Sequence, residues 1–201
     1  MAELPSGFAA IILVGGKARR FAGCAKSELV VGGATILERM LSACEGAAAR
    51  VVVGSRPSAS AALPGGVTGL VEDPPGSGPA HAVAAGLRVV PEDCTRVAIL
   101  GGDLPFLTLE ALQLLIANSE PENTGAVYGD DAGRKQWLCG LWPASRVRQN
   151  AAAVSPGAPA KSLFAGIEVN VVPWNAASPP PWFDCDTPAD LDQARTWATD
   201  T

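Results

Sequence analysis

Short apolar runs alternate with longer amphipathic stretches along this chain. The apolar runs have the length and composition of buried strands, and the predicted strands are Ala9–Val14, Arg50–Gly54, Thr68–Val71, Arg96–Leu100, Gly125–Tyr128, Trp137–Trp142 and Glu168–Val172. Stretches with apolar residues at helical spacing lie between several of them: the predicted helices are Thr35–Cys44, Pro79–Val90, Leu109–Asn118 and one from Thr187-Pro188 to about Trp197. This alternation predicts an α/β three-layer sandwich with a mainly parallel sheet and right-handed crossovers.

Residues near the carboxyl ends of the predicted strands are the first candidates for function. In open parallel sheets, ligands bind at that edge. The section Ala151–Pro181 is richer in Ala, Pro and Ser than the rest, and we interpret it as a peripheral segment on the substrate side. No internal repeat divides the chain, so we expect a single domain over residues 1–201.

The loop after the first predicted strand combines glycine with positive charge. Leu13 and Val14 lead into Gly15-Gly16, and Lys17, Arg19, Arg20 and Lys26 follow closely. Glycine lets backbone N–H groups approach a ligand, and cations beside bare N–H groups favour an anion, most often phosphate. The Walker pattern fails because Ala25 precedes the lysine, and the dinucleotide pattern G-x-G-x-x-G fails after Gly15. A glycine turn with solvated cations is the alternative.

Acidic residues follow three other apolar runs. Asp103 comes after Gly101-Gly102, where a carboxylate at a strand end could hold Mg²⁺, or could simply cap the following turn. In the sequence FDCDTPADL, Asp186 precedes the helix start and could hold the metal, stabilise the helix N-terminus, or do both. Asp73 precedes a Gly/Ser loop that includes Gly78 and that could contact a ribose or base; a plain turn explains it equally well.

Composition excludes several other classes of protein. The 201 residues are 48% hydrophobic and 17% charged, with a net charge of −5, which argues against general binding to nucleic acid or acidic membranes. No apolar stretch reaches the roughly 18 residues that a membrane-spanning helix needs. The start MAELPSG lacks signal-peptide character, so we expect a cytoplasmic protein. Five cysteines without a C-x-x-C pair, and one histidine, make a zinc site improbable.

Five motifs together resemble the molybdenum cofactor guanylyltransferase family, within the Rossmann-like nucleotidyltransferases. They are LVGGKARRFAGCAK, VEDPPGSGPAHAVAAGL, GGDLPFLT, WLCGLWP and FDCDTPADL, and they cover nearly the whole chain. The first motif is the most specific, since the family pattern L-x-G-G-x-x-x-R-x-G with a later lysine is matched by Leu13, Gly15, Gly16, Arg20, Gly23 and Lys26. Ala22 and Ala25 depart from the family, which usually has glycine and an acidic residue there. The family's Asn-x-Asn-Thr-Pro is Asp184-Cys185-Asp186-Thr187-Pro188 in this chain.

The resemblance implies transfer of GMP from GTP to the phosphate of molybdopterin. It assigns catalysis to Lys26 and Arg20, with Mg²⁺ held by Asp103 and Asp186. The implied nucleotide-binding set is Leu13, Val14, Gly15, Gly16, Lys26, Asp73, Gly78 and Asp103. It also implies partners among molybdoenzyme-maturation proteins that deliver the acceptor or receive the product.

Two other functions remain open at this point. A cytidylyltransferase acting on molybdopterin or another phosphorylated acceptor would share these motifs, although such enzymes more often carry Ala-Gly in place of Gly15-Gly16. A non-catalytic nucleotide-binding protein of the same fold is the second alternative. Ala22 and Ala25 favour it slightly, whereas the retained Arg20, Lys26, Asp103 and Asp186 oppose it.

Overall fold

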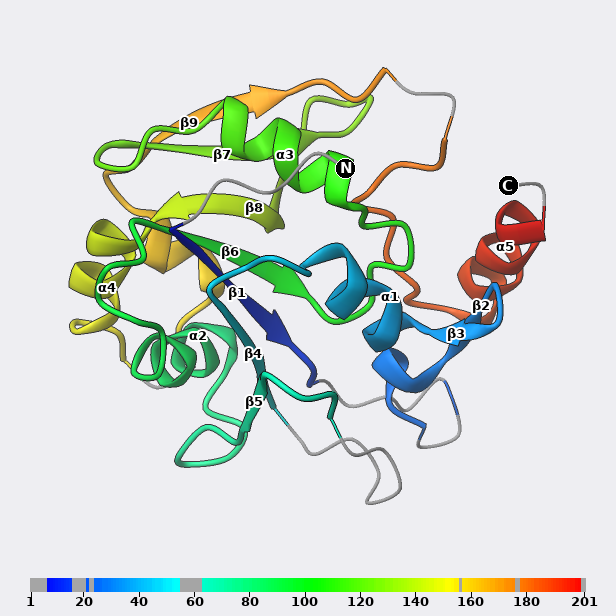
Figure 1. The fold of residues 1–201 in the computed structure, drawn as a ribbon, viewed down its shortest axis with the longest axis horizontal. Helices are drawn as coiled ribbons and strands as arrows, with labels where there is room; N and C mark the ends of the chain where they lie inside the picture. Colours follow the sequence, from blue (N-terminus) through cyan, green and yellow to red (C-terminus); the bar gives the residue numbers. More distant parts are fainter. Residues whose placement is uncertain are drawn as a thin grey trace.

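A mostly parallel sheet forms the central layer of the protein (Figure 1). The computed structural model describes residues 7–15, 21, 24–54, 63–155, 157–175 and 178–199. Within them the sheet has seven strands in the order β5-β4-β1-β6-β8-β7-β9. Their bounds are β1 (Phe8–Leu13), β4 (Ala49–Val53), β5 (Val67–Leu70), β6 (Arg96–Gly101), β7 (Thr124–Gly129), β8 (Lys135–Pro143) and β9 (Glu168–Val172). Only β8, among these strands, runs antiparallel to its neighbours, β6 and β7.

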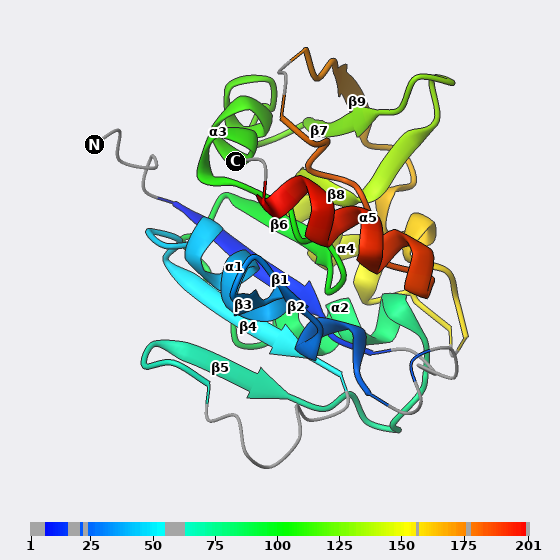
Figure 2. The same ribbon diagram turned by 90° about the vertical axis from the view of Figure 1, so that its right-hand side faces the viewer.

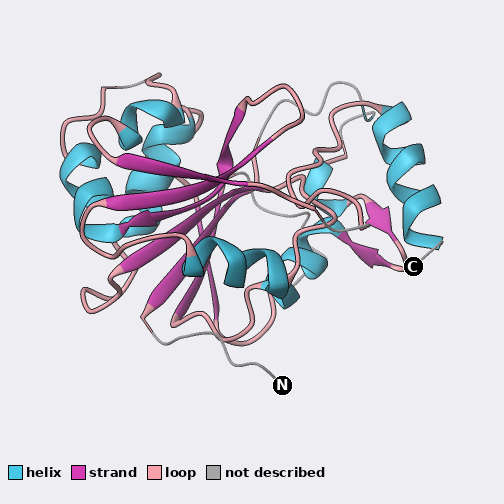
Figure 3. Cartoon of the chain, turned by 90° about the horizontal axis from the view of Figure 1, so that it is seen from above, coloured by secondary structure: helices cyan, strands magenta, loops and turns pink. Residues whose placement is uncertain are grey.

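Helices cover both faces of this sheet, so the predicted three-layer α/β sandwich is confirmed (Figure 3). Along β1, Ala10 and Ile12 point to one face and Ala9 and Ile11 to the other, and all four are fully buried. The first face packs against α1 (Ile36–Ala43) and α3 (Leu109–Ala117), and the same apolar cluster extends to α5 (Pro188–Thr199). The second packs against α2 (Pro79–Leu87), α4 (Ala144–Ala151) and the 3₁₀ helix η3 (Ala160–Phe164). Burial on both faces explains why the strand sequences are continuously apolar.

The helices begin where local capping chemistry predicts. Thr108 accepts a hydrogen bond from the N–H of Ala111 (3.1 Å) at the start of α3, and Pro79 occupies the first turn of α2. At α1, Thr35 and Glu38 form a reciprocal capping box. The end of α2 comes earlier than predicted, since the helix stops at Leu87 and a turn follows.

Apart from the two 3₁₀ helices of the described residues, the sequence did not predict one helix and one hairpin. The helix is α4, which follows β8 directly and buries Ala144 and Val147. The hairpin consists of β2 (Val30–Val31) and β3 (Ala34–Thr35), joined by two glycines in the left-handed region. This hairpin lies beside α5, and the Arg195 side chain donates to the carbonyl of Val30 (Figures 1 and 2).

The section 151–181 is less peripheral than the sequence predicted. Leu163 and Phe164 in η3 are buried in the core on one face of the sheet, and β9 forms the edge of the sheet next to β7. The prediction of a peripheral segment is therefore wrong for η3, whereas β9 has the predicted bounds and lies at the sheet edge. The error at η3 arose because a short apolar pair within an Ala/Pro/Ser-rich stretch gives no periodic signal.

All five cysteines are free thiols, and their environments differ. Cys24 is exposed, whereas Cys44, Cys94, Cys139 and Cys185 are buried. Burial raises the pKa of the Cys44 and Cys185 thiols to about 12, so these two stay protonated at neutral pH. Among the described residues, none of the helices combines the length and apolar character that crossing a bilayer demands.

Candidate active site

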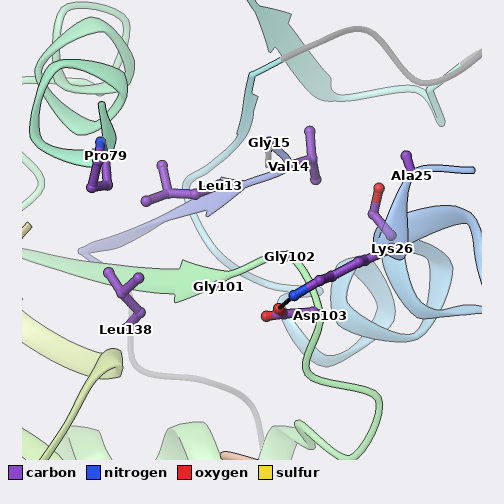
Figure 4. A pocket seen from close by; sticks show the side chains of 11 residues that line it. Leu13, Val14, Gly15, Ala25, Lys26, Pro79, Gly101, Gly102, Asp103 and Leu138 are labelled. Carbon is purple, nitrogen blue, oxygen red and sulfur yellow. Dashed lines mark hydrogen bonds and ion pairs between the residues drawn. The ribbon is translucent and has the colours of Figure 1, made fainter. Parts of the chain in front are cut away.

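A pocket opens between the carboxyl ends of β1 and β6, where the order of the strands reverses (Figure 4). The chain passes from β1 towards β4 and β5 on one side and towards β6 on the other, and such a switch point is the usual ligand site of an open α/β sheet. The pocket is lined by Leu13, Val14, Gly15, Ala25, Lys26, Ser27, Pro79, Gly101, Gly102, Asp103 and Leu138. The sequence predicted a site at the carboxyl ends of the strands, and this pocket lies there.

The strand ends approach each other closely because glycines lie at their contacts. The Gly102 N–H donates to the carbonyl of Leu13 (3.0 Å), and a Cβ on Gly102 would lie 2.6 Å from that oxygen. Gly54, at the end of β4, has a left-handed φ of 136°, and a Cβ there would overlap the carbonyl oxygen of Val14. These contacts leave no room for a side chain, and they fix the backbone that lines the pocket.

Lys26 joins two carboxylates from distant segments. It begins the 3₁₀ helix η2 (Lys26–Glu28), and its Nζ lies 3.0 Å from Oδ2 of Asp103 (Figure 4). The same ammonium also donates to Oδ1 of Asp186. Side-chain exposure is 29% for Lys26, 22% for Asp103 and 51% for Asp186, so the cluster is open to a ligand on the side of Asp186.

The charged groups of this cluster shift the pKa values of Lys26 and Asp184. Burial alone would lower the pKa of Lys26, but its hydrogen bonds and charge interactions with Asp186 and Asp103 outweigh burial and raise the pKa. Lys26 therefore stays protonated throughout the neutral range. Partial burial raises the pKa of Asp184, and the negative charges of Asp186 and Asp103 raise it further. Asp184 thus belongs to the same electrostatic cluster, although the sequence did not assign it to the site.

Asp186 reaches the cluster because the loop before α5 is fixed at both sides. The Cys185 N–H donates to the carbonyl of Asp103 (3.1 Å), which ties this loop to the end of β6. On the helix side, Asp190 accepts hydrogen bonds from the backbone N–H groups of Asp186 (3.1 Å) and Thr187 (2.6 Å). These hydrogen bonds place the Asp186 carboxylate beside the β6 loop.

The two carboxylates also form a donor set that suits a hard divalent cation. Mg²⁺ is commonly bound through one or two carboxylates plus water and substrate phosphates. Asp103 and Asp186 already share one cation, the ammonium of Lys26. Their oxygens are therefore close enough to act on a common positive charge, and both residues fit the predicted metal role.

Some of the predicted nucleotide-binding residues line the pocket, and others do not. Leu13, Val14, Gly15, Lys26 and Asp103 share the pocket. Asp73 and Gly78 do not line it: Asp73 is exposed on the loop between β5 and α2, and Gly78 immediately precedes Pro79, which does line it. Gly16 and Arg20 lie outside the described residues.

Sequence reasoning missed several residues that form the pocket walls. Leu138 was part of the motif WLCGLWP, but no site role was given to it. Ala25 was treated as a departure from the family, and the structure has it in the pocket wall beside Ser27. Apolar side chains such as those of Leu138 and Ala25 carry no chemical signature, so only the structure could identify these two positions.

Comparison with known proteins identifies the family. A family model described as a MobA-like NTP transferase domain matches residues 10–171. The chain belongs to this family. It is 28% identical over 195 residues to a molybdenum cofactor guanylyltransferase of Bradyrhizobium sp. (strain ORS 278), covering 94% of this chain and 92% of that protein. The chain is therefore a member of a nucleotidyltransferase family, as its motifs indicated.

Solved structures of similar fold agree with this assignment. A nucleotidyl transferase from Methanothermobacter superposes with a TM-score of 0.77 at 17% identity, covering 96% of this chain and 98% of that one. A Mycobacterium tuberculosis H37Rv protein, solved in complex with manganese, superposes with a TM-score of 0.70 at 17% identity, covering 94% and 98%. At these identities the likeness confirms the Rossmann-like nucleotidyltransferase fold.

The tight contact at Gly102 gives a testable prediction for this family member. We expect Gly102→Ala to lower the free energy of unfolding by about 1–3 kcal/mol, because the new methyl group must push apart the ends of β1 and β6. Gly65→Ala is the matched control, since Gly65 has no left-handed φ and a Cβ there meets nothing within 4 Å. Urea denaturation compares the two variants, and equal stabilities would contradict the close-approach argument.

Proposed function

We propose that this protein transfers GMP from GTP to the phosphate of molybdopterin, releasing pyrophosphate. The observation that carries the proposal is the position of Lys26 between Asp103 and Asp186, at the switch point of a nucleotidyltransferase fold. Nucleotidyl transfer needs no protein nucleophile, and what it does need is a site that positions two anions and stabilises growing negative charge. The named activity of the Bradyrhizobium relative supports the choice of nucleotide and acceptor.

The proposed reaction exchanges one phosphorus–oxygen bond for another. An oxygen of the acceptor phosphate forms a bond to the α-phosphorus of GTP, and the bond from that phosphorus to the β-phosphate bridge breaks. The backbone at Gly15 lines the pocket at the end of β1 and would face the triphosphate, whereas the Val14 N–H donates to the carbonyl of Val53 (2.8 Å). Arg20 is proposed to bind the same phosphates. Lys26 would stabilise the α-phosphoryl group as its charge grows.

Asp103 and Asp186 are the residues that would hold a divalent cation. When bound, such an ion supplies charge neutralisation on the phosphates. The manganese complex of the mycobacterial protein supports use of a divalent metal in this fold. We propose Mg²⁺ as the physiological ion, because two carboxylates leave room for water and phosphate oxygens in its coordination shell.

The loop between β5 and α2 is proposed to recognise the guanine base. It combines Asp73 with Gly76 and Gly78, and both glycines have left-handed φ values. The Gly76 N–H already donates to a carboxylate oxygen of Glu72 (2.9 Å), so the loop has a defined shape. Guanine offers two donors beside an acceptor, which backbone groups of such a loop can match.

An assay of base preference tests the proposed function. The protein is incubated anaerobically with molybdopterin and Mg²⁺ and with GTP, CTP or ATP in turn, and pyrophosphate release is measured. We expect GTP to be preferred by about ten- to hundredfold, as one or two specific hydrogen bonds provide. Preference for CTP would reject guanylyl transfer and favour cytidylyl transfer. No pyrophosphate with any triphosphate would reject the transferase activity itself.

Replacement of the lysine tests its catalytic role. Lys26→Ala is expected to lower kcat by about two to three orders of magnitude, since one charge contact to the transition state is lost. Arg20→Ala is expected to weaken triphosphate binding as well as the rate. Arg88→Ala is the matched control, because Arg88 is an exposed cation at the far end of α2. A near-normal kcat for Lys26→Ala would remove Lys26 from the mechanism.

Replacement of the carboxylates tests the metal site. Asp103→Asn is expected to abolish Mg²⁺-dependent turnover, and Asp186→Asn to reduce it severely. Mn²⁺ binding, followed by electron paramagnetic resonance in the presence of GTP, should weaken in both variants. Asp192→Asn is the control, since the exposed Asp192 pairs with Arg195 at 3.8 Å on α5 and lies outside the site. Unchanged Mn²⁺ affinity in Asp103→Asn would show that the metal binds elsewhere.

A further inference from the structure

Trp137 and two lysines form a cationic aromatic surface next to the active-site pocket. The Nζ of Lys135 lies 5.6 Å from the centre of the Trp137 ring, and the Nζ of Lys161 lies 5.3 Å from it. Lys135 comes from the start of β8 and Lys161 from η3, so two separate elements bring their charges to one ring. None of these three residues has a role in the site described above.

An irregularity in β8 places this surface at the edge of the pocket. Val127 of β7 pairs with Gly140, whereas Gly129 pairs with Lys135, so the β8 side carries extra residues between these pairs. In a regular strand, consecutive side chains point to opposite faces. Here Trp137 and Leu138 both pack against the same core, and Leu138 also lines the pocket. Trp137 is thus the chain neighbour of a pocket residue, in a strand whose irregular register can re-aim side chains.

The Trp137 ring is held rigidly but keeps part of its surface accessible. Trp142 and Phe164 are buried and stacked, with ring centres 3.7 Å apart. The Trp137 ring is within 10° of parallel to both, and its centre lies 5.9 Å from Trp142 and 5.8 Å from Phe164. Nearly equal distances mean that it lies beside this pair and does not extend the stack. Trp137 is only half-buried, so it offers a pre-oriented aromatic surface.

The two lysines supply positive charge that the described part of the chain does not neutralise. Neither makes an ion pair with a carboxylate among the described residues. The chain as a whole has a net charge of −5, so two unpaired cations converging on one ring are a local exception. Each cation–π contact at an exposed position is weak, and an anionic ligand can therefore recruit the ammonium groups readily.

A backbone hydrogen bond connects the segment that carries Lys161 to the loop proposed to bind the base. The Gly157 N–H donates to the carbonyl of Ser77 (2.9 Å), directly before Gly78 and the start of α2. From Gly157 the chain enters η3, which carries Lys161. A series of contacts thus links the base loop to Gly157 and Lys161 to Trp137, which precedes the pocket residue Leu138 in β8.

We propose that Trp137, Lys135 and Lys161 bind the acceptor substrate and select a planar, negatively charged heterocycle. The ring of the acceptor stacks on Trp137, its anionic groups contact the two ammonium groups, and its phosphate extends past Leu138 into the pocket. This assignment rests on the proposed function, which requires an acceptor site next to the nucleotide. It adds what that proposal left open, namely which residues bind the acceptor.

Equilibrium binding tests the surface independently of catalysis. Molybdopterin is titrated anaerobically into the protein without nucleotide, and heat is measured for the wild type, Lys135→Gln/Lys161→Gln, Trp137→Ala and Trp137→Phe. We expect the double lysine variant and Trp137→Ala to bind about ten- to hundredfold more weakly, with Trp137→Phe close to the wild type, as base–aromatic stacking energies imply. Arg88→Ala controls for loss of an exposed cation. GTP affinity should be unchanged in every variant.

Each outcome distinguishes this proposal from the proposed function. The double lysine variant leaves the buried Trp142–Phe164 pair intact, so weaker binding in that variant is not a folding defect, and urea denaturation verifies this. Equal molybdopterin affinity in the wild type and the double variant overturns the surface assignment, even when pyrophosphate release shows that transfer occurs. No binding by the wild type overturns it too. Selective loss of molybdopterin binding supports it, even in a protein that releases no pyrophosphate.

Discussion

The ammonium group of Lys26 is the constraint on which the candidate site depends. It holds the carboxylates of Asp103 and Asp186 together, although they come from segments far apart in the chain. Two carboxylates repel each other at close range, and a shared cation removes that cost. Through this contact the start of η2, the end of β6 and the loop before α5 meet at one edge of the sheet. The hydrogen bond from the Cys185 N–H to the carbonyl of Asp103 fixes the same junction, and the Cys185 side chain is fully buried.

This junction is possible only because the backbone at the strand ends packs so closely. Parallel strands bring their carboxyl ends to one edge, and the reversal of strand order between β1 and β6 opens a gap there. Gly54 and Gly102 let the neighbouring chains approach Val14 and Leu13 without side chains in between. Substituting either glycine would therefore alter the pocket through the backbone, although neither has a functional group. The fold thus positions the charged residues by backbone contacts.

Much of the fold and part of the site could be predicted because their signals are local. A few adjacent residues are enough to predict the continuously apolar β1 and β6 and the Thr108 cap of α3. Asp103 was predicted because it follows a glycine pair at a strand end, and Lys26 because it closes a glycine-containing loop that matches the family motif; both line the pocket. The polar α4 was missed because it buries only Ala144 and Val147. The placement of Trp137 depends on the β7–β8 register, which no local pattern encodes.

The charges at this site also explain why nucleotide and metal should bind together. Lys26, Asp103 and Asp186 carry one positive and two negative charges, and Asp184 lies close enough for these carboxylates to raise its pKa. The described cluster is therefore net negative and would repel a free triphosphate. A divalent cation held by Asp103 and Asp186 would offset that negative charge and would leave the Lys26 ammonium available to phosphate. The Lys26 ammonium contacts both carboxylates and offsets one of their two negative charges, so the cluster keeps the negative charge that a cation would need.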